Sequence, residues 1–403
     1  MTTVKMVKLG TLIKPAKLQK CGNDDYPVLS MTMHNGLVFQ SDKFKKSVAS
    51  QDKSTYKVVH RNQLVIGFPI DEGVLATQRI TDVGIVSPAY GIWDVDQTKI
   101  IPEFLEYALR CNRAIDYYKA KLRGSTARRR SLPTPTLLEL DVPLPDIEQQ
   151  KLTLTTIHHA KNALDSRQAQ LTKLDELIKA RFVEMFGNFV YELDRWSTCE
   201  IGDVADTIDP QPSHRTPPVS LDGIPYIGIA ECNYQTRKIA FKSARKVGKD
   251  VLKEHKNRYT LNDGDFIIGK IGTIGKPFFL PTDCDYTLSA NTVLIKPQKD
   301  KISPRFLFAI FESEYMDRII DAEKKSTSQP AFGIQKVRSI EIPLPPLSLQ
   351  NQFADFAAEV DKSKLFVGSA AAHKPFDIGF FSQKHCATPC KRGIISSKHM
   401  IFH

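Results

Sequence analysis

The chain has 403 residues, 41% of them hydrophobic and 25% charged, which is typical of a folded protein long enough for two cores. It contains no run of 18 apolar residues and no signal-peptide core after Met1, and its seven cysteines are scattered and odd in number. Nothing here argues for a membrane span or export, and the cysteines fit a reducing cytoplasm better than a disulfide framework, so we expect a cytoplasmic protein.

The net charge of +11 is distributed unevenly. Residues 1–145 carry +7, residues 146–187 carry 0, residues 188–345 carry +1 and residues 346–403 carry +3. A basic first segment favours a polyanion as partner, because lysine and arginine gain free energy by releasing the counterions condensed on phosphates. Charge alone indicates nucleic-acid binding only weakly.

Residues 1–145 have the pattern of a mixed unit of strands and helices. An entry strand is predicted at 7–10, and short strands follow at 36–40, 56–59, 63–67 and 83–86. A helix is predicted over 102–121. A loop at 123–133 then combines Gly, Ser, Thr and Pro with four arginines, and residues 137–144 connect it to the next element.

The most regular stretch of the chain runs from 146 to 187. Its apolar residues recur at steps of three, four or seven, which predicts one stripe along a helix about 60 Å long. Pro143 and Pro145 prevent an earlier start, and Gly187 fits the end. Nothing local can bury such a stripe, so a spacer helix paired with a second long helix is favoured over an ordinary surface helix. The predicted interface residues are Ile147, Leu154, Ile157, Leu164, Leu171, Leu174, Ile178 and Phe182, with Phe353, Phe356 and Val360 from the second helix.

The sequence repeats itself at an offset of about 200 residues. VPLPDIEQQ at 142–150 returns as IPLPPLSLQ at 342–350, and the Pro and Phe-Leu of 101–105 return in 303–307. A period of this length indicates two duplicated domains rather than a solenoid. The second unit is therefore predicted over 188–345, with strands at 223–230, 266–268 and 292–296, a glycine-rich loop at 269–276 and a helix at 306–322.

The second long helix begins at residue 346, but its pattern stops at about Val367. The duplication predicts that it should continue to about residue 386, whereas residues 368–403 show no helical stripe. We expect an irregular tail there, with the pattern of a shifted reading frame or a replaced terminus. Helical sequence in another frame of the coding DNA would support this hypothesis.

The duplicated Pro-Leu-Pro-x-x-x-x-Gln segments, the stretch DGDFIIGKIGTIGK at 263–276 and the Ser-Thr loops at 125 and 326 resemble the specificity subunit of type I restriction–modification systems over residues 1–367. The resemblance implies an α/β (α+β) fold in which two target-recognition domains are separated by long antiparallel coiled-coil helices, the second truncated. Each domain would read one half of a bipartite DNA site. The helices would set the spacing and dock methyltransferase subunits and, through them, the restriction subunit. The chain would have no catalytic residues, and S-adenosylmethionine, ATP and Mg would be bound only by its partners.

Candidate DNA contacts lie in loops, where arginine can reach guanine edges or clamp phosphate. The first basic loop and its counterpart at 324–330 could instead be solvated charge runs, and the glycine-rich loop could be merely a hairpin. Polar residues just before strands could read bases or be satisfied turn residues. The candidates are Arg123, Ser125, Thr126, Arg128, Arg129 and Arg130; Lys324, Lys325, Ser326, Thr327 and Gln329; Lys270, Thr273 and Lys276; and Ser87, Tyr90, Ser289 and Asn291.

Two rival functions stay open from the residues alone: a coiled-coil interaction scaffold without DNA specificity, and an enzyme of the P-loop or nuclease kind. The glycine-rich loop does not match a Walker A motif, because Ile274 replaces the second Gly and Pro277 replaces Ser or Thr. His158 and His159 fit a surface or interface position in the long helix. His385, Cys386 and Cys390 have poor spacing for zinc, and no metal is expected.

Overall fold

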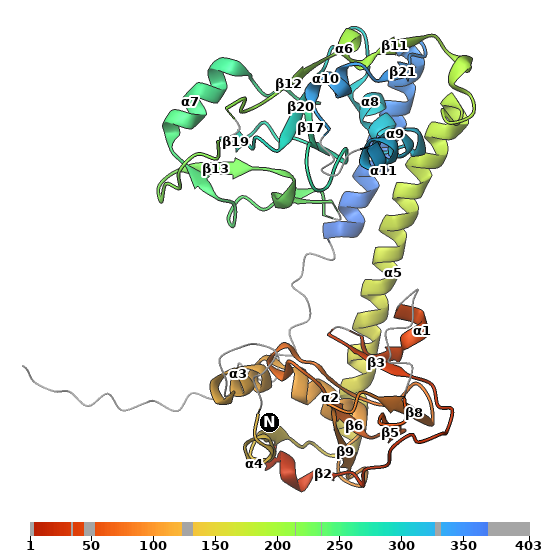
Figure 1. The fold of residues 1–403 in the computed structure, drawn as a ribbon, viewed down its shortest axis with the longest axis vertical. Helices are drawn as coiled ribbons and strands as arrows, with labels where there is room; N and C mark the ends of the chain where they lie inside the picture. Colours follow the sequence, from red (N-terminus) through yellow and green to blue (C-terminus); the bar gives the residue numbers. More distant parts are fainter. Residues whose placement is uncertain are drawn as a thin grey trace, which may run out of the picture. The chain divides into compact units, whose positions relative to one another are not determined.

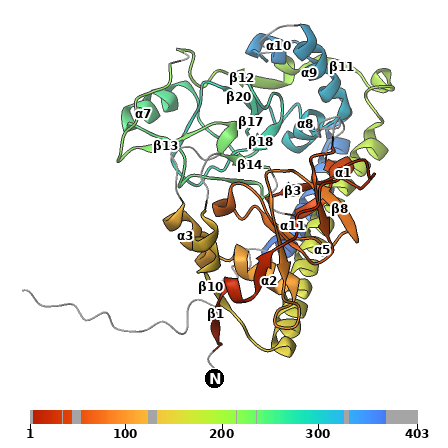
Figure 2. The same cartoon turned by 60° about the horizontal axis from the view of Figure 1, so that its bottom comes forward.

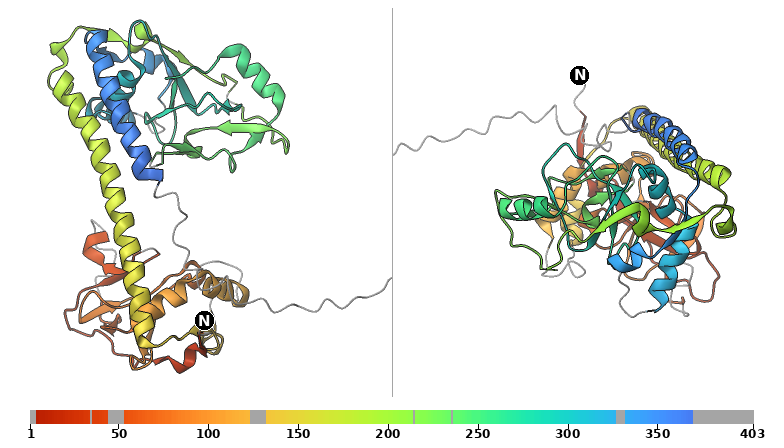
Figure 3. Two further views of the ribbon diagram at one scale, coloured as in Figure 1. Left: turned by 180° about the vertical axis from the view of Figure 1, so that it is seen from behind. Right: turned by 90° about the horizontal axis from the view of Figure 1, so that it is seen from above.

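The computed structural model describes residues 4–33, 35–43, 53–122, 132–213, 215–234, 236–326 and 332–369 (Figure 1, with other views in Figures 2 and 3). The chain divides into two compact units, the first ending at Ala163 and the second beginning at Leu164. This division falls within the long helix α5 (Ile147–Phe186), so the helix is not a compact unit of its own.

The first unit is built around a four-stranded antiparallel sheet. Two further strand pairs adjoin it, and α2 (Pro102–Arg110) packs against β7 while α3 (Asn112–Lys121) packs against the short turn η2 (Ile70–Glu72). The sheet order is β2 (Ile13–Pro15), β9 (Gly91–Val95), β6 (Leu64–Ile66) and β7 (Leu75–Thr77); the pairs are β3 (Leu29–Thr32) with β4 (Gly36–Phe39), and β5 (Lys57–His60) with β8 (Val83–Val86).

The second unit has a four-stranded antiparallel sheet with the same connections. Its order is β12 (Ala205–Ile208), β20 (Thr292–Pro297), β17 (Phe266–Gly269) and β18 (Pro277–Phe279). The elements beside it are β16 (Lys246–Val247), β13 (Ile224–Ile227) and β19 (Thr287–Leu288) in a three-stranded sheet, the pair β14 (Cys232–Asn233) and β15 (Lys238–Ile239), and the helices α7 (Lys249–Arg258), α8 (Pro304–Phe311) and α9 (Glu314–Ser326).

The two units share one plan, which confirms the internal duplication. In each unit an entry strand pairs antiparallel with the strand before the long helix: β1 (Met6–Lys8) with β10 (Asp141–Pro143), and β11 (Thr198–Glu200) with β21 (Glu341–Pro343). A five-residue helix precedes that strand in both, α4 (Thr134–Leu138) and α10 (Ile334–Arg338). The units differ beside their central sheets: the second contains the parallel pair β13 and β19 and the helix α7, whereas the described residues of the first have a single parallel bridge, between Val28 and Ile85.

Two predicted helices are each divided in two, so their prediction as continuous helices is wrong. The helix at 102–121 breaks at Cys111, whose ψ of 159° is extended and cannot continue a helix. The break lets α3 pack on η2 and bury Ala114 and Tyr118. The helix at 306–322 is likewise divided into α8 and α9. Residues 9 and 10, predicted within the entry strand, instead belong to a 3₁₀ turn over Leu9–Thr11.

The repeated Pro-Leu-Pro-x-x-x-x-Gln segment places a buried glutamine in the first turn of each long helix. Gln350 Nε2 donates to Pro345 O at 2.8 Å, and its Oε1 accepts from Ser303 N at 2.9 Å. Gln150 makes the same two bonds, to Pro145 O at 2.9 Å and from Ile101 N at 2.8 Å. Each glutamine therefore ties the start of a long helix to the start of α2 or α8 in its own unit.

Helices α5 and α11 (Leu347–Ser369) lie antiparallel within the second unit (Figure 3). The Phe182 and Phe353 rings are 5.4 Å apart, and Lys364 Nζ lies 2.7 Å from Asp175 Oδ1. Residue numbers fall along α5 as they rise along α11, and α5 ends where Gly187 adopts a φ of 87°. The predicted helix over 146–187 and its antiparallel partner are therefore confirmed.

The apolar stripe of α5 is buried at its two ends by different partners. Leu154 is 7% exposed in the first unit's core, whereas Ile178 and Phe182 are each 4% exposed in the second unit's core, beside α11. Between them Leu164 is 43% exposed. Of the other predicted interface residues, Phe353 and Val360 are buried, and the rest are half-buried: Ile147, Ile157, Leu171, Leu174 and Phe356. The helix α11 continues to Ser369, two residues beyond the predicted Val367, and the predicted tail from 370 onward lies outside the described residues.

Candidate nucleic-acid interface

Two predicted DNA-contacting segments of the second unit meet at Lys270. This residue opens the glycine-rich loop after β17, and its backbone N donates to Asn291 O at 2.8 Å in the turn between β19 and β20. Its carbonyl accepts from Phe332 N at 2.9 Å, two residues after the end of the predicted basic loop at 324–330. The fold thus joins segments that lie about 20 and 60 residues apart in the sequence.

The Lys270 side chain is held inside the protein. Its Nζ lies 2.8 Å from Asp209 Oδ2 at the end of β12 and donates to Ala290 O at 3.1 Å. The side chains of Lys270 and Asp209 are 11% and 15% exposed. The other oxygen of Asp209, Oδ1, accepts from Gln211 N at 3.1 Å. The contact of Lys270 with phosphate stays an untested prediction, and its ammonium already has two partners within the chain.

The rest of the glycine-rich loop folds tightly and leaves polar groups at the surface. Gly275 has a φ of 74°, and a Cβ there would collide with Ile320 of α9, so only glycine allows this packing. Thr273 and Lys276 are exposed. Lys276 Nζ lies 5.8 Å from the centre of the Tyr234 ring, and Tyr234 Oη donates to the Lys276 carbonyl at 3.2 Å. Thr273 and Lys276 are thus accessible, and their contact with phosphate stays a prediction.

Ser87 and Ser289 occupy equivalent turns in the two units. Ser87 Oγ accepts from Ala89 N at 3.4 Å, and Ser289 Oγ accepts from Asn291 N at 3.3 Å. These bonds make both serines turn residues, which is one of the two roles expected for them. Burial raises the pKa of Tyr90, whose carbonyl accepts from Lys57 Nζ at 2.7 Å. Asn291 is exposed, and base reading by these four residues stays a prediction.

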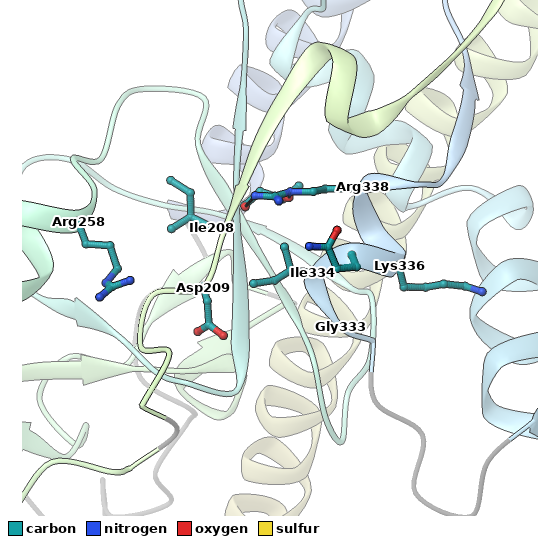
Figure 4. Close-up of a pocket in the computed structure, with 9 residues that line it drawn as sticks. Ile208, Asp209, Arg258, Gly333, Ile334, Lys336 and Arg338 are labelled. Carbon is teal, nitrogen blue, oxygen red and sulfur yellow. Dashed lines mark hydrogen bonds between the residues drawn. The ribbon is translucent and has the colours of Figure 1, made fainter.

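An open groove with a volume of about 510 Å³ lies beside Asp209 in the second unit (Figure 4). Arg338 Nε donates to Thr207 Oγ1 at 2.7 Å and joins α10 to β12, and Lys336 Nζ lies 3.2 Å from Glu323 Oε2. Figure 4 shows that the Lys336 side chain points away from Asp209. Arg258 lies on the other side of Asp209 from Lys336 (Figure 4). These cations were not among the predicted contacts, although Lys336 and Arg338 follow the second basic loop closely in the sequence. The groove is lined by Thr207, Ile208, Asp209, Arg258, Gly333, Ile334, Gln335, Lys336 and Arg338.

Three of the predicted basic-loop residues, Lys324, Lys325 and Ser326, lie in α9. Lys324 is exposed near the end of α9, and its Nζ lies 3.1 Å from Asp321 Oδ1. Lys325 and Ser326 are in the helical backbone of α9. The remaining candidates lie outside the described residues: Arg123, Ser125, Thr126, Arg128, Arg129, Arg130, Thr327 and Gln329.

A cluster of charged residues in the first unit joins α5 to the sheet. Thr77 N and Oγ1 each donate to the buried Glu106 Oε2 at 2.9 Å. Glu103 Oε1 lies 2.6 Å from Arg79 Nη1 and 2.9 Å from His158 Nε2 on α5. His158 therefore has the interface position expected for it.

The described residues hold neither a metal-binding cluster nor a membrane-spanning helix. They contain no group of three or more His, Cys, Asp or Glu side chains placed to hold a metal ion. None of the helices in this part of the chain is long and apolar enough to span a membrane. His385, Cys386 and Cys390 lie outside the described residues.

Comparisons with known proteins identify the domain type. Residues 194–365 match the family described as the type I restriction modification DNA specificity domain. The type I restriction enzyme EcoBI specificity subunit of Escherichia coli is 20% identical over 367 residues, which are 79% of this chain and 74% of that protein. The MjaVIII specificity subunit of Methanocaldococcus jannaschii is 22% identical over 246 residues, 55% of each chain.

Solved structures share the fold. The S subunit of a type I restriction–modification system from M. genitalium has a TM-score of 0.51 and 13% identity, covering 91% of this chain and 92% of that one. A chain from a structure of type I R-M complex assembly has a TM-score of 0.51 and 16% identity, covering 92% and 93%.

These relatives are specificity subunits rather than catalytic ones, and none supports the scaffold or enzyme alternatives. They confirm the expected mixed fold and the prediction that this chain is not itself an enzyme. Residues 194–365 thus match the DNA specificity domain of type I restriction–modification systems, and most of the chain is similar in sequence and fold to specificity subunits of these systems.

Proposed function

We propose that this chain gives sequence specificity to a type I restriction–modification complex, with each unit reading one half of a bipartite DNA site. Specificity subunits of these systems bind DNA and assemble with other subunits. The observation that carries the proposal is the duplicated plan: two sheets of the same strand order, each tied to a long helix by an equivalent buried glutamine. Paired reading units on one chain suit a split site, as paired half-sites suit dimeric repressors.

We further propose that α5 and α11 set the half-site spacing as a coiled coil and dock methyltransferase subunits, and through them the restriction subunit. S-adenosylmethionine, ATP and Mg would then be bound by those partners. A reducing cytoplasm fits the free cysteines of the described residues, which are Cys21, Cys111, Cys199, Cys232 and Cys284. Methylation mapping of a host that carries the assembled complex would reveal the bipartite site.

Domain exchange tests the division of labour. Replacing residues 1–145 with those of a relative of different specificity should change one half of the mapped site, and replacing residues 188–345 should change the other. Binding should also weaken steeply with salt, because contacts with phosphate release counterions. A mapped site that ignores both exchanges would refute the proposal.

The first basic loop allows a sharper test. Changing Arg128, Arg129 and Arg130 together to alanine should weaken binding to the first half-site more than to the second. A matched control removes the same charge from exposed lysines elsewhere in the first unit, Lys14, Lys17 and Lys20. Equal loss at both half-sites in the arginine variant would refute the assignment of this loop to the first half-site.

A further inference from the structure

The hairpin that carries the glycine-rich loop has an equivalent in the first unit with the opposite charge. The connection between β17 and β18 contains Lys270 and Lys276, whereas the equivalent connection between β6 and β7 contains Asp71 and Glu72. The ion pair between Lys270 and Asp209 thus has no lysine counterpart in that connection of the first unit. Any function of this pair is therefore specific to the second unit.

The ion pair is continuous with a buried hydrogen-bond network. Tyr226 Oη donates to Gln211 Oε1 at 2.6 Å and accepts from Ala290 N at 3.1 Å. Gln211 N in turn donates to Asp209 Oδ1. The turn at 289–291 is therefore held from one side by Tyr226 and from the other by the side chain and backbone of Lys270.

Burial favours the internal partner of Lys270 over a phosphate. The Lys270 side chain is 11% exposed, so its ammonium group has lost much of its hydration, and the carboxylate of Asp209 compensates for that loss. Reaching out to DNA would separate Lys270 from this carboxylate. It would also leave the negative charge of Asp209 close to the incoming phosphate, which opposes binding. Lys276, in the same loop, is exposed and has no such constraint.

We propose that Lys270 is a positioning residue for DNA reading by the second unit. Its ion pair with Asp209 fixes the relative places of the glycine-rich loop, the turn at 289–291 and the chain that enters α10, and these places determine how well the second half-site is discriminated. This inference rests on the proposed function, since it presupposes that the second unit reads one half-site.

The test compares the assembled complex with a variant that removes both charges, Lys270→Met with Asp209→Asn. Lys270→Met alone leaves the buried carboxylate without its cation and risks misfolding, so the double variant keeps the test interpretable. The probe is a short duplex with the bipartite site that methylation mapping identifies. Two companion duplexes have either the first or the second half-site scrambled. Affinity is measured for all three over a range of salt concentrations.

We expect the double variant to lose about tenfold in its preference for the intact over the scrambled second half-site. Its preference for the first half-site and the slope of log affinity against log salt should be unchanged. A slope that becomes about 0.9 shallower would show that Lys270 is a phosphate ligand and would overturn the proposal. Unchanged discrimination at the second half-site, or equal loss at both, would also overturn it. If the unaltered complex fails to distinguish intact from scrambled duplexes, the proposed function itself fails.

Discussion

Replacing the buried glutamine of the second repeated segment should destabilise the second unit strongly. The side chain of Gln350 is fully buried and bonds to Ser303 N and Pro345 O. Gln350→Ala removes both bonds and leaves a buried donor and a buried acceptor unpaired. Each unpaired group costs about 1–3 kcal/mol, so the free energy of unfolding of the second unit should fall by about 2–6 kcal/mol.

The equivalent change in the first unit should cost less. Gln150 is itself buried, but its bonds to Ile101 N, Pro145 O and Lys99 O are only partly buried, so water can replace some of them. We expect Gln150→Ala to lower the free energy of unfolding of the first unit by about 1–2 kcal/mol.

Hydrogen exchange of backbone amides is the suitable assay, because a chain with two compact units need not unfold in one step. Protection of the amides in α8 and α11 should fall in Gln350→Ala, while the amides of the first unit keep theirs. The matched control is Gln352→Ala, which truncates an exposed glutamine on the same helix. If the two variants lose the same protection, the buried glutamine does not hold α11 to α8 and the reasoning is refuted.

Three further outcomes are expected. Lys276→Met should make the salt dependence of DNA binding shallower by about 0.9 while leaving stability unchanged, and an unaltered slope would exclude a phosphate contact for this lysine. Lys364→Met should lower hydrogen-exchange protection at the end of α11 by about 1 kcal/mol, because its 17% exposed side chain pairs with Asp175 and lies against α5. The control is Lys362→Met, which changes an exposed lysine of the same helix. Equal protection in both variants would count against the ion pair between Lys364 and Asp175. Burial lowers the pKa of His255 below its usual 6.5. As the pH falls below 6.5, the imidazole of His255 therefore takes up a proton in the unfolded chain before it does so in the folded protein. The second unit should therefore lose stability in that range in urea titrations, and His255→Gln should abolish that loss; an unchanged pH dependence would contradict it.

The position of many elements could be predicted because their signals are local. Prolines at 143 and 145 and a glycine at 187 mark the boundaries of α5, and the spacing of apolar residues between them marks a helix. Local patterns could not predict the break at Cys111, since that residue takes an extended conformation to let α3 pack on η2, a contact between segments about 40 residues apart.

The amino-acid sequence by itself determined the duplicated plan, the long helices and the resemblance to specificity subunits, since periodicity, turn residues and repeated motifs are written along the chain. Only the tertiary structure decided that the half-buried Lys270 pairs with Asp209, 61 residues away, while Lys276 in the same loop is exposed. It also decided that the stripe of α5 is covered at both ends and open at Leu164. The physical reason is that burial and ion pairing depend on which distant segments meet, and residue spacing along the chain does not encode that.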